Sequence, residues 1–215
     1  MKKKKYKLPY KVNIMDILPF EEIYSWQRDK FHIDIPRLEN GEMEFEIATE
    51  KQRVKYAALD ITDVLGDLLD AVSRILHGPE KDDGGGYRAS DYIAQVIHDT
   101  ENGIFLWTFV YSENLLQVAI WKTWNVDFLE EMADYHFDAA KYESVKQKPV
   151  KDITQGLKFS VAMRPDYFVL PLLNAANRLK QSYSAHDFEN HCAFPFPEEQ
   201  YAHLKHWLDV EWQPE

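Results

Sequence analysis

The chain has 215 residues, 45% hydrophobic and 14% aromatic, and carries a formal net charge of −11. This length and apolar content exclude a wholly disordered chain and allow a core without disulfide or metal support. The single cysteine, Cys192, excludes an internal disulfide framework and is typical of a cytoplasmic protein. We find no apolar stretch of about 18 residues and no secretory signal, so the sequence predicts no membrane segment.

The charge is distributed unevenly along the chain. Residues 1–11 contain six lysines and no acid, and the rest of the chain has 19 basic against 36 acidic residues, a net charge of −17. We expect residues 1–11 to form a disordered basic tail and residues 12–215 to form a single domain. Nucleic acid phosphates would repel so acidic a domain, which excludes nucleic acid as its partner.

A short strand and a long helix are the first predicted elements. Residues 42–47 alternate glutamate with Met43, Phe45 and Ile47, which favours a strand with these apolar side chains inward, and a helix start is the alternative. Residues 51–77 predict an amphipathic helix that ends at Gly78-Pro79. The apolar side of this helix gathers eight residues: Ile61, Val64, Leu65, Leu68, Leu69, Val72, Ile75 and Leu76.

The next segment predicts a three-stranded antiparallel meander over about residues 92–122. Residues 93–98 alternate in the manner of a strand, and two apolar runs within residues 103–124 flank a turn at Ser112-Glu113-Asn114. We expect four of its side chains to be buried: Trp107, Phe109, Val118 and Ile120. Because both faces of these strands are apolar, helices or another subunit should pack on each side.

The last third of the chain predicts helices around one further strand. We expect helices over residues 126–145, 165–183 and 197–208, a strand over residues 157–163, and an extended connection at residues 194–197. We expect Tyr201, Leu204 and Leu208 to be buried in the last helix. The predicted fold class is therefore α+β, an antiparallel meander covered by amphipathic helices.

The order of these elements carries a family resemblance. A long amphipathic helix, an aromatic meander, a further helix, the Phe194-Pro195-Phe196-Pro197 connection and a terminal helix bearing Leu204 follow one another. Over roughly residues 55–208, this order resembles small uncharacterised bacterial proteins, some of which look like immunity proteins of polymorphic toxin systems. The resemblance implies a non-catalytic protein that neutralises a toxin, and it transfers no functional residue to this chain.

The candidate binding site is an acidic stripe opposite the apolar side of the predicted helix. Its four members are Asp60, Asp63, Asp67 and Asp70. A solvated helix face explains such a stripe without any function, and a docking surface for a basic partner protein, such as a toxin, is the functional interpretation. Complementary charge would then raise the rate of association.

An enzyme is the alternative function, and its residues would be His186, His191, Cys192 and His203. Imidazole and thiolate bind zinc, but this spacing matches no recurrent zinc motif, so we predict neither a metal nor a catalytic cysteine. Gly84-Gly85-Gly86 follows a predicted helix, whereas a phosphate loop follows a strand, and no Gly-Lys-Ser/Thr comes after it, so no cofactor is predicted. A structural or regulatory homo-oligomer is the remaining alternative.

Overall fold

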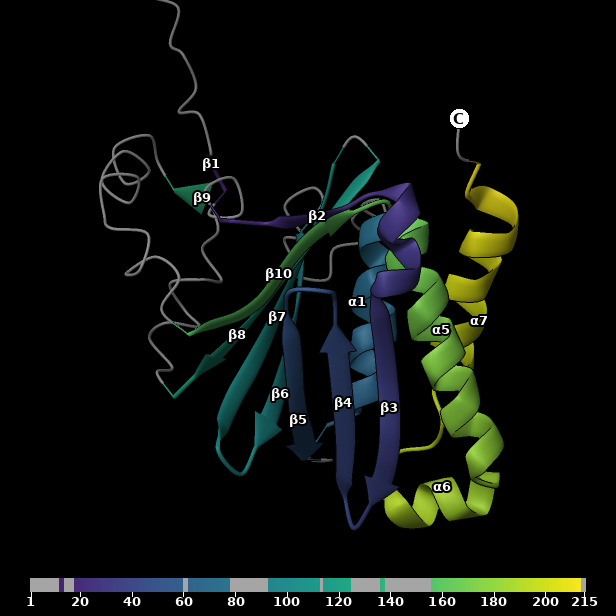
Figure 1. Cartoon of the computed structure of the whole chain (residues 1–215). Coiled ribbons are helices and arrows are strands. Elements are labelled where there is room, and N and C mark those ends of the chain that lie inside the picture. Colours follow the sequence, from purple (N-terminus) through teal and green to yellow (C-terminus); the bar gives the residue numbers. More distant parts are fainter. Residues whose placement is uncertain are drawn as a thin grey trace, which may run out of the picture.

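The computed structural model describes residues 12–13, 18–59, 62–77, 93–112, 114–124, 136–137 and 156–213. Its largest sheet has five strands in the order β2 (Glu21–Ile23), β10 (Leu157–Met163), β8 (Leu115–Thr123), β7 (Gly103–Ser112) and β6 (Ile93–Thr100). A second sheet contains β3 (His32–Glu39), β4 (Glu42–Ala48) and β5 (Arg53–Leu59). The helices are α1 (Val64–His77), α5 (Pro165–Ser182), α6 (Ala185–His191) and α7 (Glu198–His206). The fold is α+β, as predicted (Figure 1).

The predicted meander is confirmed as β6, β7 and β8, which pair in antiparallel register. Trp107, Phe109, Val118 and Ile120 are fully buried, as expected. The rings of Trp107 and Phe109 meet Phe168 of α5 edge-on, so a helix packs on this face. Side chains that point to the other face, such as Trp121, are buried as well.

The five-stranded sheet continues beyond the meander. The predicted strand over residues 157–163 is confirmed as β10, which pairs antiparallel with β8. β2 then adds to β10 in parallel, with Glu21 opposite Val161 and Ile23 opposite Met163. A parallel pair needs a long connection between its strands, and here that connection is most of the chain.

The three-stranded sheet contains one predicted strand and two unpredicted ones. β4 is confirmed, with Met43, Phe45 and Ile47 buried. Asn40 and Gly41 join β3 to β4 with φ values of 54° and 77°, the positive pair that a tight hairpin turn of this kind requires. β3 forms one edge of this sheet, and α5 packs along it.

The helix predicted over residues 51–77 is wrong in its first half. Residues Arg53–Leu59 form β5, in which the buried Val54 and Tyr56 alternate with the exposed Arg53 and Lys55. This alternation has the period of a strand, and pairing with β4 outweighs the helix propensity of lysine, arginine and alanine. The helix begins at Val64, and the described members of its predicted apolar side are buried: Val64, Leu65, Leu68, Leu69, Val72, Ile75 and Leu76.

The C-terminal helices agree with the sequence in most respects. α5 and α7 occupy the predicted ranges, α6 was not predicted, and a π-helical turn follows α7 at Trp207–Glu211. Leu204 is buried as expected, whereas Tyr201 and Leu208 are only half-buried. α7 packs against α1, which also contacts β6 and β7, so α1 lies in the centre of the core (Figure 1).

Other predictions fall largely outside the described residues. These include the basic tail over residues 1–11, the glycine-rich loop over residues 82–86 and most of the helix over residues 126–145. Within that last range, His136–Phe137 form a short strand, β9, antiparallel to β1 (Val12–Asn13), which contradicts a continuous helix there. Across the described part of the chain, none of the helices combines the length and the apolar character that a bilayer crossing requires.

Candidate functional site

The predicted acidic stripe begins at the N-terminus of α1. Asp60 lies outside the described residues. Asp63 immediately precedes the helix, and its Oδ1 accepts the backbone N–H of Gly66 at 2.9 Å, the bond that an N-cap residue makes. A side-chain carbon at position 66 would overlap the Asp63 carboxylate, so a glycine there leaves room for the cap. Asp63 therefore has a structural role that the sequence interpretation missed.

The other two aspartates lie on the outer side of α1. Asp67 is exposed in the first turn, where a negative charge interacts favourably with the helix dipole. Partial burial raises the pKa of Asp67, and the charge of Arg74 lowers it in part. Asp70 pairs with Arg74 one turn along. Partner binding by this stripe stays a prediction, and Asp67 is its most accessible described member.

The histidines and the cysteine of the enzyme alternative are spread over α6 and α7. His186 and His203 are exposed, Cys192 is buried, and the ring of His191 packs edge-on against Tyr183. Within the described ranges, no three His, Cys, Asp or Glu residues are placed to hold a metal ion.

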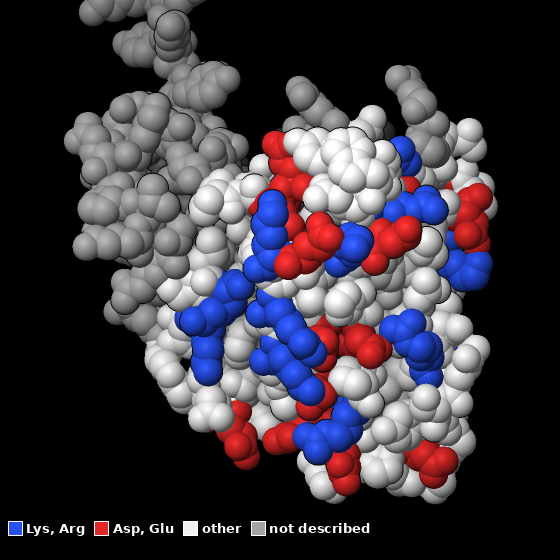
Figure 2. Space-filling model, viewed as in Figure 1, with Lys and Arg blue, Asp and Glu red and all other residues white. Residues whose placement is uncertain are grey.

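Charges on the outer face of the three-stranded sheet are mixed. Figure 2 shows acidic and basic side chains intermingled there. Glu46 of β4 pairs with Arg53 of β5 at 2.6 Å, and Glu44 pairs with Lys55 at 2.8 Å. Exposed pairs of this kind stabilise a fold little, but they neutralise one another. This face therefore offers no patch of a single sign to a charged partner.

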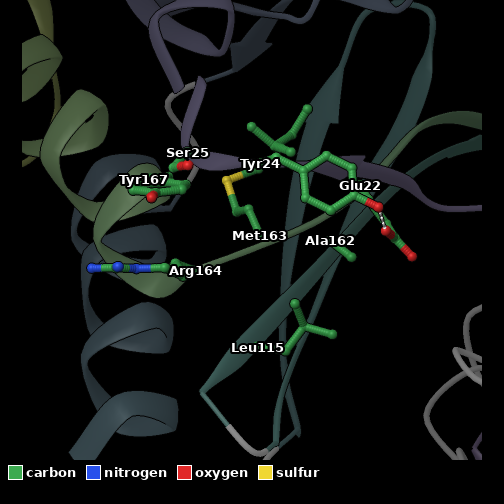
Figure 3. A pocket seen from close by; sticks show the side chains of 9 residues that line it. Glu22, Tyr24, Ser25, Leu115, Ala162, Met163, Arg164 and Tyr167 are labelled. Atoms are coloured by element: carbon green, nitrogen blue, oxygen red, sulfur yellow. Dashed lines mark hydrogen bonds between the residues drawn. The ribbon is translucent and has the colours of Figure 1, made fainter. Parts of the chain in front are cut away.

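An aromatic groove lies where β2, β10 and α5 meet. It has a volume of about 480 Å³, and its nine lining residues are Glu22, Ile23, Tyr24, Ser25, Leu115, Ala162, Met163, Arg164 and Tyr167 (Figure 3). Tyr24 is 46% exposed, and its ring stacks on that of Trp26, which is 74% exposed, with centroids 4.7 Å apart and planes within 8°. Two stacked aromatic rings thus stand in solvent beside an apolar depression.

Local backbone structure places the two rings. β2 ends at Ile23, and a 3₁₀ turn, η2, spans Ser25–Lys30. Tyr24 joins them: its backbone N–H donates to the Gln27 side chain at 3.3 Å, and its carbonyl accepts the Gln27 N–H at 2.8 Å. These bonds fix Tyr24 and Trp26, two residues apart, on the same side of the turn.

Side-chain hydrogen bonds hold β2 against the rest of the molecule. The amide of Gln52 donates to the Ser160 carbonyl and accepts the Ser160 N–H, both at 2.9 Å, and so pairs with β10 as a strand would. The same amide donates to the buried Glu21 carboxylate at 3.0 Å, and the Thr49 hydroxyl donates to that carboxylate at 2.7 Å. The loop between β4 and β5 thereby bonds to both β2 and β10.

Opposite charges lie at the two ends of the groove. The Tyr24 hydroxyl donates to the Glu22 carboxylate, and this bond together with the Glu22 charge raises the pKa of Tyr24. At the other end, Arg164 donates two hydrogen bonds to Asp166, at 3.0 and 3.1 Å, and lies over the ring of Tyr167 (Figure 3). Because Asp166 neutralises Arg164, Glu22 is the one of the two whose charge no ion pair among the described residues compensates.

Comparison with known proteins gives no family for this chain: no family model, no curated protein and no solved structure matches it.

The sequence interpretation missed the groove entirely. Tyr24 and Trp26 stand in a polar context, Tyr-Ser-Trp-Gln-Arg-Asp-Lys, in which an aromatic residue has no apolar neighbours to pack with. That context was the available signal for exposed rings. Their neighbours Met163 and Tyr167 are some 140 residues away along the chain, and only the parallel pairing of β2 with β10 brings them together.

Proposed function

We propose that this protein is a non-catalytic protein that binds another protein through the aromatic groove. The stacked, exposed pair Tyr24 and Trp26 is the observation that carries the proposal. Binding is favourable when a partner covers exposed rings beside an apolar hollow, and Trp and Tyr supply much of the binding energy of protein interfaces. Leu115, 42% exposed at the groove's edge, extends the apolar contact.

The charge of the chain supports a basic partner. The formal net charge is −11, and Glu22 presents a carboxylate inside the groove. Long-range attraction between an acidic and a basic protein raises their association rate, while buried rings set the dissociation rate. A basic toxin neutralised by an immunity protein is one pairing of this kind, and it accords with the order of elements in the sequence.

Asp67 provides a second candidate surface, because it is exposed near the N-terminus of α1. Its charge can be reversed without harm to the cap, whereas Asp63 caps the helix. If α1 binds the partner, Asp67→Lys should slow association at low salt and leave the fold intact, since the screening length is about 8 Å at physiological ionic strength. Unchanged association rates would exclude Asp67 from the binding surface.

The decisive experiment compares Trp26 with Trp124, two tryptophans of nearly equal exposure. The full chain is used to capture a partner from its native cell, and the purified partner is titrated against wild type, Trp26→Ala and Trp124→Ala. Trp26 stacks on Tyr24, which lines the groove, whereas Trp124 is 72% exposed and lies beside Gly103 at the end of β8. Loss of an interface tryptophan costs about 2–4 kcal/mol, so Trp26→Ala should raise Kd by roughly 30- to 1,000-fold.

Trp124→Ala should leave the affinity within a factor of about two, because isolated exposed residues contribute little. Equal affinities for all three proteins would refute the groove as the binding site. Sedimentation of the chain alone supplies a second check, because a dimer that Trp26→Ala dissociates would show the groove to be a self-association surface instead.

A further inference from the structure

A fully buried histidine lies where the two sheets meet. His98 of β6 has no solvent exposure, and its ring centroid lies 5.1 Å from that of Phe45, 5.8 Å from that of Tyr56 and 6.1 Å from that of Trp107. Phe45 and Tyr56 belong to the three-stranded sheet, whereas Trp107 belongs to the five-stranded one. The imidazole therefore fills an aromatic space shared by both sheets.

Two hydrogen bonds join these side chains into a chain across the junction. The Trp107 Nε1–H donates to the Tyr56 hydroxyl oxygen at 2.6 Å, and that hydroxyl lies 2.7 Å from Nδ1 of His98. Because the Tyr56 hydroxyl oxygen accepts the bond from Trp107, the hydroxyl proton points to Nδ1 of His98 and donates to it. This assignment puts the imidazole proton on Nε2, for which the described residues offer no hydrogen-bond partner of normal geometry.

The junction is held by side chains and not by a backbone ladder. β5 and β6 lie side by side, yet β5 pairs only with β4, and β6 pairs only with β7. The Tyr56 ring stacks on Phe105 of β7, with centroids 4.0 Å apart. Separating β5 from β6 would therefore break this aromatic contact and the Trp107–Tyr56–His98 bonds, while every strand pair of the two sheets stayed intact.

Charging the imidazole is incompatible with this arrangement. A protonated Nδ1 can only donate, so the Tyr56 hydroxyl proton would lose its acceptor in a buried space. Burial lowers the pKa of His98 to about 3, and the nearby backbone of Val64 opposes this only in part. Tyr56 is the titratable side chain in contact with the ring, and burial raises its pKa, so no described anion faces His98.

We propose that His98 makes the junction of the two sheets acid-labile: when its ring gains a proton, β5 separates from β6 while each sheet keeps its hydrogen-bonded strands. The proposal is independent of the aromatic groove. Its direction follows from linkage. A histidine that must stay neutral in the closed state stabilises that state above its ordinary pKa of 6.5, and this contribution is lost as the pH falls from 6.5 towards 3.

Hydrogen exchange measured by NMR tests the proposal on the full chain. The Trp107 indole N–H reports on the junction, and backbone amides of the β7–β8 ladder report on the sheet. A pKa of 6.5 in the open state against about 3 in the closed state predicts a roughly 100-fold loss of Trp107 indole protection between pH 7.5 and 4.5, after correction for intrinsic exchange. Because global unfolding also exposes His98, protection of the ladder amides falls by a similar factor, but these amides should stay at least about tenfold better protected than the indole at both pH values.

Two variants separate His98 from other causes of acid sensitivity. In His98→Asn, an amide oxygen near the position of Nδ1 accepts from Tyr56 and cannot be charged, so the loss of protection should shrink to less than about threefold. His191→Asn, at a half-buried histidine outside the junction, should behave as wild type. A full loss in His98→Asn, or a Trp107 indole as well protected as the ladder amides in wild type, would overturn the proposal. If His98→Asn does not fold, the imidazole of wild type is titrated by NMR, and a midpoint above pH 6 would overturn it.

Discussion

Removal of the Tyr56 hydroxyl tests how much the buried hydrogen-bond chain contributes to stability. Tyr56→Phe keeps the ring, which lies between Phe45 at 5.6 Å and Phe105 at 4.0 Å, so little cavity forms. The change leaves the Trp107 Nε1–H and the His98 Nδ1 without the partner they share, and both residues are fully buried. Each buried polar group left unpaired costs about 1–3 kcal/mol.

With two such groups, we expect the free energy of unfolding to fall by roughly 3 kcal/mol. This value allows for the gain that comes from no longer burying the Tyr56 hydroxyl. In a chain of this size, about 1 kcal/mol shifts Tm by about 2–4 °C, so Tm should fall by about 6–12 °C. Urea unfolding at pH 7.5 measures the free energy, and an unchanged m-value would show that the denatured state is comparable.

The matched control is Tyr24→Phe, because that hydroxyl binds Glu22 on the exposed surface. We expect it to change stability by less than about 0.5 kcal/mol. If Tyr56→Phe is equally silent, the hydrogen-bond chain does not stabilise the junction and the reasoning fails. A double-mutant cycle with His98→Phe sharpens the test: without Nδ1, loss of the hydroxyl should cost about 1–3 kcal/mol less.

Four further substitutions test other parts of the structure by the same urea assay. Trp107→Ala should cost about 3–5 kcal/mol, since it truncates a fully buried aromatic residue, and an unchanged free energy of unfolding would show that the side chain is not part of the core. Asp63→Ala should cost about 1 kcal/mol through loss of the helix cap, whereas Asp67→Ala should change stability by no more than about 0.5 kcal/mol, and equal effects would contradict the assigned cap. Gln52→Ala should cost about 2–4 kcal/mol by leaving both backbone groups of Ser160 unpaired, and a neutral result would mean that water replaces the amide.

Local patterns were sufficient for some elements and not for others. The meander was predictable because β7 and β8 are dense apolar runs separated by a polar turn, so every local signal agreed. β3 was missed because Pro36 stands inside it, and proline argues against a central strand. β3 is an edge strand, and one side of an edge strand makes no ladder hydrogen bonds, so the N–H that proline lacks is not needed there. Edge position depends on tertiary structure, which the sequence does not display.

The candidate site shows the same division. The acidic stripe required a helix that had already begun by Asp60, and the start of α1 at Val64 turns Asp63 into a cap. An aspartate just before an apolar periodic run is a recognised N-cap signal, so this role could have been read locally. The groove could not, because it depends on the parallel pairing of β2 with β10, and no turn or spacing in the sequence specifies such a pairing.

Side chains, in place of backbone ladders, make the joints between the parts of this fold. Gln52 pairs with the backbone of Ser160, and the Tyr183 hydroxyl donates to the Leu38 carbonyl at 2.9 Å on the outer edge of β3. The contact between Tyr56 and His98 joins the two sheets in the same way. A backbone ladder persists through most substitutions, but a joint made by one side chain depends on that residue and on its protonation state. The His98 junction lies at such a joint, whereas the groove lies where β2 and β10 pair through their backbones.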